Sequence, residues 1–267
     1  LLEITRQQAE GLERELNLVD HGGFRAYLGM KHSPPFIAEA VQQMRADGVE
    51  RAIGVVMAPH WSGMSVESYI ERVRPQTVDG PSFTFVRSYH DHPGFVSFLS
   101  ARVAEALGRL TSSERDGATV IFSAHSLPVR KLADGSLRCL RCHVCEDSCR
   151  YRDGLAETAD LVAAELGLAR HTIAWQSAGR TDDPWWGPPI EDVIADLASQ
   201  GCPAVVVCSA GFVADHLEIL YDLDVEAQAI AEQSGMRLVR TEMPNADPAF
   251  VHVLADVVRE QLSAPRT

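Results

Sequence analysis

The sequence predicts an α/β protein built on parallel β-sheets, and two observations carry this prediction. Short apolar runs rich in β-branched residues alternate along the chain with amphipathic stretches of helical period, and most of these apolar runs are continuous. Continuous apolar strands are buried on both faces, as in a parallel sheet covered by helices. The 267 residues are 46% hydrophobic, enough to bury a large core in one big domain or two smaller ones.

Strands are expected where a short apolar run ends in small or turn-forming residues. The clearest is the run Ala-Val-Val-Val that begins at Ala204 and is flanked by two cysteines. In chain order, the expected strands are residues 24–29, 52–58, 83–86, 119–124, 172–176, 204–209 and 238–241.

Helices are expected where apolar residues recur three or four positions apart between these runs. In chain order, they are residues 3–16, 36–46, 66–74, 94–110, 155–166, 190–200, 217–233 and 249–262. The regular exchange of strand and helix is the pattern of linked βαβ units.

A stretch rich in proline and glycine at residues 74–82 lies near the expected boundary between two α/β halves. We predict an N-terminal half over residues 1–110 and a C-terminal half over residues 111–267. The C-terminal half carries a cysteine-rich loop at 139–149 and ends in a helix that is able to pack back on the first half.

The charge of the chain argues against several classes of partner. Lys and Arg total 24 against 37 Asp and Glu, which gives a net charge of −13. Such a surface repels phosphate backbones and anionic lipid, so we expect no nucleic-acid partner. No apolar run approaches the roughly 18 residues of a membrane span, and we expect a cytoplasmic protein. The phosphate-binding loops GxGxxG and Walker A are missing from the sequence, which leaves a nucleotide site without support.

Polar residues follow three of the expected strands, at residues 58–62, 123–128 and 209–218. Ligands of open α/β sheets bind where the strands end. His125 comes directly after an apolar strand, where an imidazole can bind a metal or accept a proton, or simply be a hydrogen-bonded strand-end histidine. Glu218 falls in the first turn of the helix after the third strand, where a carboxylate is also favoured by the helix dipole alone.

Three carboxylates follow one another at four-residue intervals along that helix: Glu218, Asp222 and Glu226, which we call the acidic row. No Lys or Arg occurs from 213 to 236. Like charges at this spacing destabilise a helix by about 0.2–0.5 kcal/mol per pair. Three hard oxygen ligands on one face suit a divalent cation, although a solvated acidic face is the alternative.

Four of the six cysteines lie close together with the spacing Cys-x2-Cys-x2-Cys-x3-Cys, namely Cys139, Cys142, Cys145 and Cys149. In a cytoplasmic protein, such density favours a metal site over disulfides. The spacing fits an iron–sulfur cluster, including [4Fe–4S], or zinc.

Several motifs together resemble the ferrochelatase family over essentially the whole chain. The most specific are residues 122–128, Phe-Ser-Ala-His-Ser-Leu-Pro, and residues 211–222, Gly-Phe-Val-Ala-Asp-His-Leu-Glu-Ile-Leu-Tyr-Asp. Residues 28–32, 58–69, 175–179 and 183–188 also match the family. The motifs look most like the Bacillus-like branch, which acts on coproporphyrin III and feeds a later decarboxylation to haem. The resemblance implies two Rossmann-like halves around a porphyrin cleft, with Fe(II) insertion as the reaction and other haem-pathway enzymes as possible partners.

The resemblance also implies roles for individual residues. His125 and Glu218 match the metal-handling catalytic pair, and Asp222 and Glu226 match an outer metal site. The matched substrate-binding residues are Tyr69, Lys31 and His32. Cluster-containing members of the family carry a [2Fe–2S] centre after the Ser-Leu-Pro motif, so the resemblance favours [2Fe–2S] for the four cysteines over [4Fe–4S] or zinc.

Two other functions are alternatives to a ferrochelatase, and the chain differs from the family at its N-terminus. A cobalt chelatase acting on another tetrapyrrole would share the same scaffold, and a non-enzymatic iron–sulfur or zinc module would bind no porphyrin. Protoporphyrin IX is the alternative porphyrin. The chain begins after the position of the family's first strand and porphyrin-gripping loop, so a tyrosine and an arginine of that segment have no counterpart in this sequence.

Overall fold

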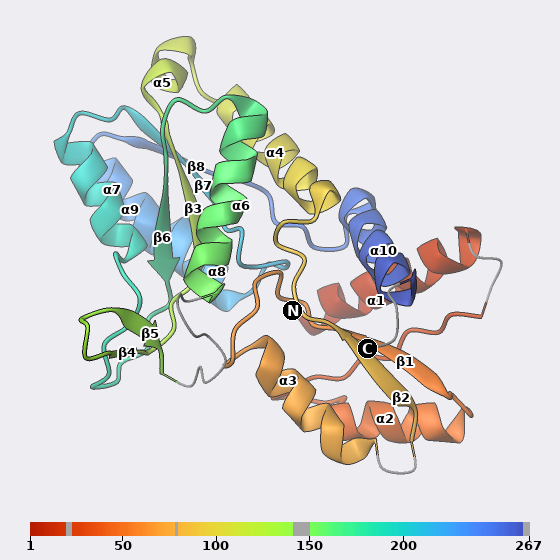
Figure 1. Ribbon diagram of the computed structural model, residues 1–267. Helices are drawn as coiled ribbons and strands as arrows, with labels where there is room; N and C mark the ends of the chain where they lie inside the picture. The colour runs from red at the N-terminus through yellow and green to blue at the C-terminus, as the bar shows by residue number, and fades with distance from the viewer. Residues whose placement is uncertain (20–22, 78–79, 141–149, 264–267) are drawn as a thin grey trace. The chain divides into compact units, whose positions relative to one another are not determined.

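The computed structural model describes residues 1–19, 23–77, 80–140 and 150–263. The chain forms two compact units, one of Leu1–Tyr89 with Pro244–Thr267 and the other of His90–Met243 (Figure 1). The division therefore falls after residue 89 and not after residue 110, because helix α4 (Pro93–Gly108) packs against α6 (Arg150–Leu166) inside the second unit. Helix α10 (Pro248–Ser263) belongs to the first unit.

The first unit is built on two parallel strands, β1 (Arg51–Val55) and β2 (Ser82–Val86), paired in register from one end to the other. Helices α1 (Leu2–Val19) and α10 pack against each other, and Leu16, Ala255 and Val258 form a small core with Ile53 of β1. The remaining helices of this unit are α2 (Ile37–Ala46), α3 (Val66–Val73) and the 3-10 turn η1 (Arg74–Gln76).

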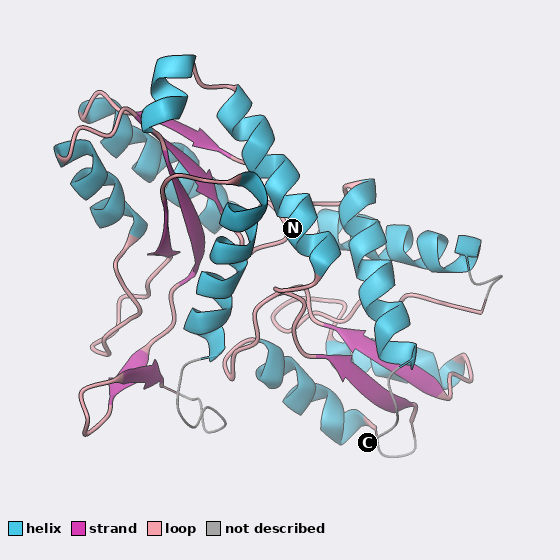
Figure 2. Ribbon diagram, turned by 45° about the horizontal axis from the view of Figure 1, so that its top comes forward, coloured by secondary structure: helices cyan, strands magenta, loops and turns pink. Residues whose placement is uncertain are grey.

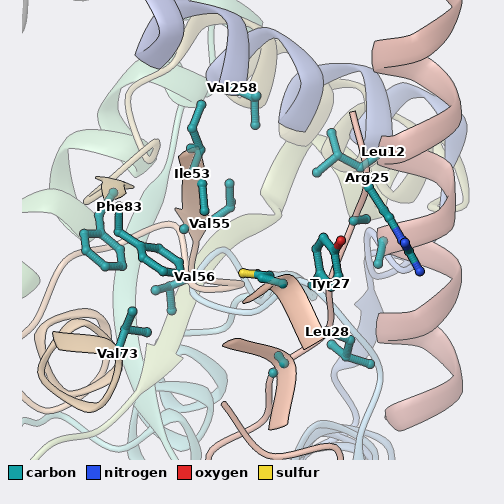
Figure 3. A pocket seen from close by; sticks show the side chains of 18 of the residues that line it. Leu12, Arg25, Tyr27, Leu28, Ile53, Val55, Val56, Val73, Phe83 and Val258 are labelled. Carbon is teal, nitrogen blue, oxygen red and sulfur yellow. The ribbon is translucent and has the colours of Figure 1, made fainter. Parts of the chain in front are cut away.

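The strand predicted at residues 24–29 is wrong. The backbone of Phe24 bonds to the side-chain amide of Asn17, and the Ala26 N–H donates to the Glu13 carboxylate, so side chains of α1 take the place of a strand partner. A groove of about 1340 Å³ is lined by both this segment and β1. Figure 3 shows Tyr27 and Leu28 facing it. Among the described residues this run pairs with no strand, and side chains of α1 bond part of its backbone instead.

The second unit contains a four-stranded parallel sheet in the order β6-β3-β7-β8. Its strands are β3 (Thr119–His125), β6 (His171–Gln176), β7 (Ala204–Cys208) and β8 (Arg237–Arg240). Helices α4 and α6 cover one face (Figure 1). The other face carries α7 (Ile190–Ser199) and a helix made of α8 (Leu217–Tyr221), the π-helical segment η2 (Asp222–Ala227) and α9 (Gln228–Gln233). Every residue of β7 is buried, so the predicted α/β class with parallel sheets is confirmed.

Two short elements lie outside the sequence prediction. An antiparallel hairpin of β4 (Val129–Lys131) and β5 (Leu137–Cys139) follows the central strand, and Figure 2 shows it as a pair of short strands apart from the main sheet. Helix α5 (Ser112–Gly117) begins with a capping box in which Thr111 and Glu114 bond each other's backbone N–H. Among the described residues, no helix is both long and apolar enough to cross a membrane.

Candidate functional site

His125 is the last residue of β3, a central strand of the sheet, and its orientation is fixed by its neighbours. The Tyr151 hydroxyl donates to the His125 carbonyl at 2.9 Å, and the ring Nδ1–H donates to the Ser126 carbonyl. A carbonyl can only accept, so the proton of the neutral ring sits on Nδ1. Nε2 is therefore the atom with a lone pair available for a metal or a proton.

Glu218 lies close to Nε2 of His125, in the first turn of α8. Its Oε2 lies 3.7 Å from Nε2 of His125, and the two side chains are 53% and 34% exposed, so both can be reached from solvent. The loop that leads into α8 comes this close because Gly211 has no side chain, and a Cβ there would lie 2.4 Å from the Ala124 Cβ. The structure thus brings together the two residues predicted as the catalytic pair.

His216 is a third group at this edge of the sheet that the sequence analysis did not single out. The Phe212 ring centre lies 6.3 Å from that of His125 and 5.3 Å from that of His216. Burial lowers the pKa of His216, against the opposing pull of Glu218. His216 is therefore neutral at pH 7 and adds no positive charge near an incoming cation.

The three strand ends around His125 are tied together by one buried side chain. Gln176, at the end of β6, accepts hydrogen bonds from the Ser123 hydroxyl of β3 at 2.6 Å and from the Ser209 hydroxyl after β7 at 3.3 Å. All three residues are buried. Such a network gives the site a rigid base. Its serines lie in the predicted strand-end motifs, but their shared partner is far away in sequence.

The acidic row continues outward from Glu218, and its helix is not a plain α-helix. Four residues of an α-helix make slightly more than one turn, whereas four residues of a π-helix make slightly less. The angular offset around the helix axis from Glu218 to Asp222 is therefore opposite in sense to that from Asp222 to Glu226, which keeps the three positions near one face of the helix. The buried stripe beside them, Ile219, Leu223, Ala227 and Ala231, keeps the same four-residue spacing.

Two residues from other elements join the outer part of the row. Ser177 follows β6 with a left-handed φ of 57°, and its hydroxyl donates to Asp222. A non-glycine residue in that region carries strain that is characteristic of functional sites. Glu191, in the first turn of α7, is half-buried, and burial raises the pKa of its carboxyl group with further contributions from Asp222 and Glu226. The sequence analysis missed both, because neither belongs to the helix that carries the row.

The residues predicted to bind the substrate lie in the first unit. The Lys31 ammonium group lies 5.3 Å from the centre of the Tyr69 ring and donates to the Met64 carbonyl at 3.4 Å. Burial raises the pKa of Tyr69, so its hydroxyl is protonated at neutral pH. His32 is exposed in the bend that follows Lys31. Lys31 and Tyr69 thus form a cation–aromatic pair, and the exposed His32 follows Lys31 in the chain.

The cysteine motif is only partly within the described residues. Cys139 ends β5 and is buried, and its sulfur accepts a hydrogen bond from the Trp186 indole N–H at 3.3 Å. The Trp186 ring in turn stacks on Trp175 with ring centres 6.0 Å apart. Cys142, Cys145 and Cys149 lie outside the described residues.

Comparisons with known proteins give the family and the fold of the chain. Residues 1–262 match the family model described as ferrochelatase. The chain is 42% identical over 266 residues to a coproporphyrin III ferrochelatase of Anoxybacillus flavithermus, covering 98% of this chain and 80% of the relative. It is 41% identical over 268 residues to that of Bacillus subtilis, covering 98% and 82%. The solved structure of SirB from Bacillus subtilis with Fe3+ is similar in fold, with a TM-score of 0.68 at 10% identity, covering 97% of this chain and 90% of that chain.

Proposed function

Because the chain belongs to the ferrochelatase family, we propose that it inserts ferrous iron into coproporphyrin III during haem synthesis. The observation that carries the proposal is the pairing of His125 Nε2 with the Glu218 carboxylate, 3.7 Å apart at the open edge of the sheet. One atom with a lone pair and one anionic oxygen are what metal insertion requires, since the ion needs new ligands while the porphyrin gives up protons.

The proposed chemistry is a proton–metal exchange. Two pyrrole N–H protons leave the macrocycle, Fe2+ loses its water ligands, and the ion forms four bonds to nitrogen with no change in oxidation state. His125 accepts a pyrrole proton at Nε2, which its Nδ1–H bond to Ser126 leaves available. Glu218 takes up this proton from the imidazolium and releases it to solvent, so that Nε2 can accept the second pyrrole proton in turn. Alternatively, Glu218 coordinates the ion as it sheds water, and His125 passes both protons to solvent one after the other.

The acidic row supplies the iron in this proposal. Asp222 and Glu226 lie along the helix beyond Glu218, with Ser177 holding the Asp222 carboxylate. Carboxylates of one sign raise the local concentration of a hydrated divalent ion. Hard oxygen donors hold Fe2+ loosely enough for it to move on.

Coproporphyrin III carries four propionates, and the proposed contacts for them are the Lys31 ammonium group and the His32 side chain, with the Tyr69 ring against the macrocycle. Lys31 already points its ammonium group over an aromatic ring. In a protein with a net charge of −13, a local cation such as Lys31 is needed to hold a tetracarboxylate.

The cysteines form the proposed resident metal centre, a [2Fe–2S] cluster, with [4Fe–4S] and zinc as alternatives. Cys139 fits as a ligand, because its buried sulfur accepts an indole N–H and hydrogen bonds of this kind tune iron–sulfur centres. The cluster would be held by Cys139, Cys142, Cys145 and Cys149 and would supply one-electron redox chemistry. Iron insertion itself transfers no electron, so the proposed reaction does not use it. Thiolates and ferrous iron both require a reducing compartment, which favours the cytoplasm.

An anaerobic insertion assay tests the proposed function. Fe(II) is offered with coproporphyrin III and, separately, with protoporphyrin IX, and the loss of free-porphyrin fluorescence is followed. We expect higher kcat/KM with coproporphyrin III. Equal or better use of protoporphyrin IX would reverse the assignment of the substrate. Turnover with Co(II) alone would identify a cobalt chelatase, and no shift of the Soret band with either porphyrin would overturn the proposed enzyme.

A further inference from the structure

We propose that Arg240 is a positioning residue that holds the helix of the acidic row in register with His125. The inference deepens the proposed function and rests on it, since the row matters only if it carries iron. The Arg240 guanidinium group lies at the end of β8 and donates to two aspartates, Asp215 just before α8 and Asp224 in η2.

The contacts of Arg240 are those of a two-armed clamp. Its Nε and Nη2 donate to the two oxygens of Asp224 at 2.8 and 3.0 Å, and its Nη1 donates to Asp215 at 3.2 Å. The side chain is 18% exposed. Burial alone would lower the pKa of Arg240, but the hydrogen bonds and charges of Asp224 and Asp215 raise it overall. Bidentate guanidinium–carboxylate pairs fix orientation as well as distance.

The two aspartates bracket the part of the helix that carries the inner half of the row. Asp215 lies just before α8, and Asp224 lies inside the π-helical segment, so Glu218 and Asp222 fall between them. The strand that carries Arg240 is itself fixed, because Arg240 pairs with Val207 of β7 and the Thr241 N–H donates to the Val207 carbonyl at 2.9 Å. The clamp therefore ties the helix to the sheet that ends in His125.

Packing supports this part of the helix along one stripe only, through Ile219 and Leu223. Leu217, Leu220 and Tyr221 are 80%, 43% and 50% exposed, and only Ile219 of α8 is buried. A π-helical turn has poorer hydrogen-bond geometry than an α-helix and persists where tertiary contacts hold it. Arg240 supplies such a contact inside the turn itself.

If Arg240 acted only through its charge, its removal would have the opposite effect on the use of Fe2+ from that expected if Arg240 positions the helix. Arg240 is a cation close to a path for cations, so by charge alone its removal should strengthen the attraction of Fe2+. If Arg240 holds the row in place, its removal should weaken the use of Fe2+ instead.

The test compares Arg240→Met with Arg237→Met in the whole protein. Arg237 lies on the same strand and pairs with Glu114 at 3.4 Å, so its replacement removes the same charge without touching the helix. We expect Arg240→Met to raise KM for Fe(II) about five- to tenfold, with a smaller change in kcat, and Arg237→Met to leave both unchanged. Arg240→Lys keeps the charge but cannot reach both aspartates, so it should resemble Arg240→Met.

Asp224→Asn removes the other partner of the clamp and changes the charge in the opposite direction. By charge alone, Asp224→Asn should raise KM for Fe(II), Arg240→Met should lower it, and the two effects should cancel in the double variant. Positioning predicts that both single variants raise KM for Fe(II) and that the double variant stays raised, but no further than either single one. Hydrogen exchange of residues 217–227 should be faster in both single variants, and this readout does not depend on turnover. A lower or unchanged KM in Arg240→Met, with unchanged exchange, would overturn the clamp. If exchange accelerates but wild-type protein inserts no iron, the proposed function has failed and the clamp has not.

Discussion

The helix from Leu217 to Gln233 has an inner and an outer end that differ in construction. At the inner end, Glu218 faces a histidine whose tautomer is set by a backbone carbonyl and whose strand is anchored by Tyr151 and Gln176. At the outer end, Asp222 and Glu226 are held by one serine hydroxyl and by the geometry of a π-helical turn, and Glu226 is exposed. A fixed pair suits a chemical step, whereas a loose series of carboxylates suits delivery of an ion.

The largest expected effect is at the fixed pair. His125→Ala removes the imidazole nitrogen that lies 3.7 Å from the Glu218 carboxylate, so insertion should fall by about two to four orders of magnitude, the usual contribution of a general base. The strand should survive, because the hydrogen bond from Tyr151 is to the backbone of His125. Anaerobic steady-state kinetics measure the loss of iron insertion, and a thermal unfolding curve shows whether the fold is kept. Turnover near the wild-type rate would remove His125 from the reaction.

Glu218→Gln comes next in size. It keeps the shape of the side chain and removes the charge, so we expect kcat to fall by about tenfold or more while KM for the porphyrin changes little. The matched control is Asp196→Asn, a carboxylate of α7 that takes no part in the site. A variant that changed only KM for Fe(II) would place Glu218 with the outer carboxylates and would erase the distinction between the two ends.

Changes at the outer end should affect KM for Fe(II) and not kcat. The double variant Asp222→Asn, Glu226→Gln should raise KM for Fe(II) several-fold, about 0.5–1.5 kcal/mol in binding, and leave kcat nearly unchanged. The effect should shrink in high salt, because exposed charges are screened. Unaltered metal dependence at low ionic strength would mean that the acidic row is a solvated face.

The smallest effect concerns Glu191, whose pKa is raised by burial. When the pKa of a carboxyl group is higher in the folded than in the unfolded protein, the folded state favours the protonated form. The resulting stabilisation is fully present below the unfolded-state pKa and is lost as pH rises through the folded-state pKa. Glu191→Gln should therefore increase thermal stability at pH 7, by about 1–2 °C, and have little effect near pH 4. Calorimetry at the two pH values measures the difference, and an equal shift at both would contradict burial as its cause.

Local pattern was enough to predict much of the second unit. Continuous apolar runs identified β3 and β7, and the polar residues after them placed His125 and Glu218 at one edge of the sheet. The same rule failed at residues 24–29, since an apolar extended run forms a strand only where a partner is in reach.

What the sequence could not predict depends on pairs distant along the chain. No local sequence pattern at Gln176 indicates that its side-chain oxygen accepts bonds from serines of two other strands. None at Glu191 indicates that this residue lies near Asp222. The helix at 217–233 was expected as one α-helix, but its four-residue spacing of buried positions is that of a helix with a π turn. That spacing is visible in the sequence and could have been used.

The π turn has a consequence for how the gene can change. A π turn is an α-helix with one residue inserted, because its hydrogen bond reaches one position further. Loss of a single codon between Asp222 and Ala227 would turn the buried spacing of Ile219, Leu223, Ala227 and Ala231 from four-four-four into four-three-four, the ordinary pattern of an amphipathic α-helix. Such a deletion would keep the apolar residues of the helix on its buried face, and it would replace the wider π turn by an α turn only where the helix carries the acidic row. The inserted residue is therefore a change that selection for folding alone would not retain.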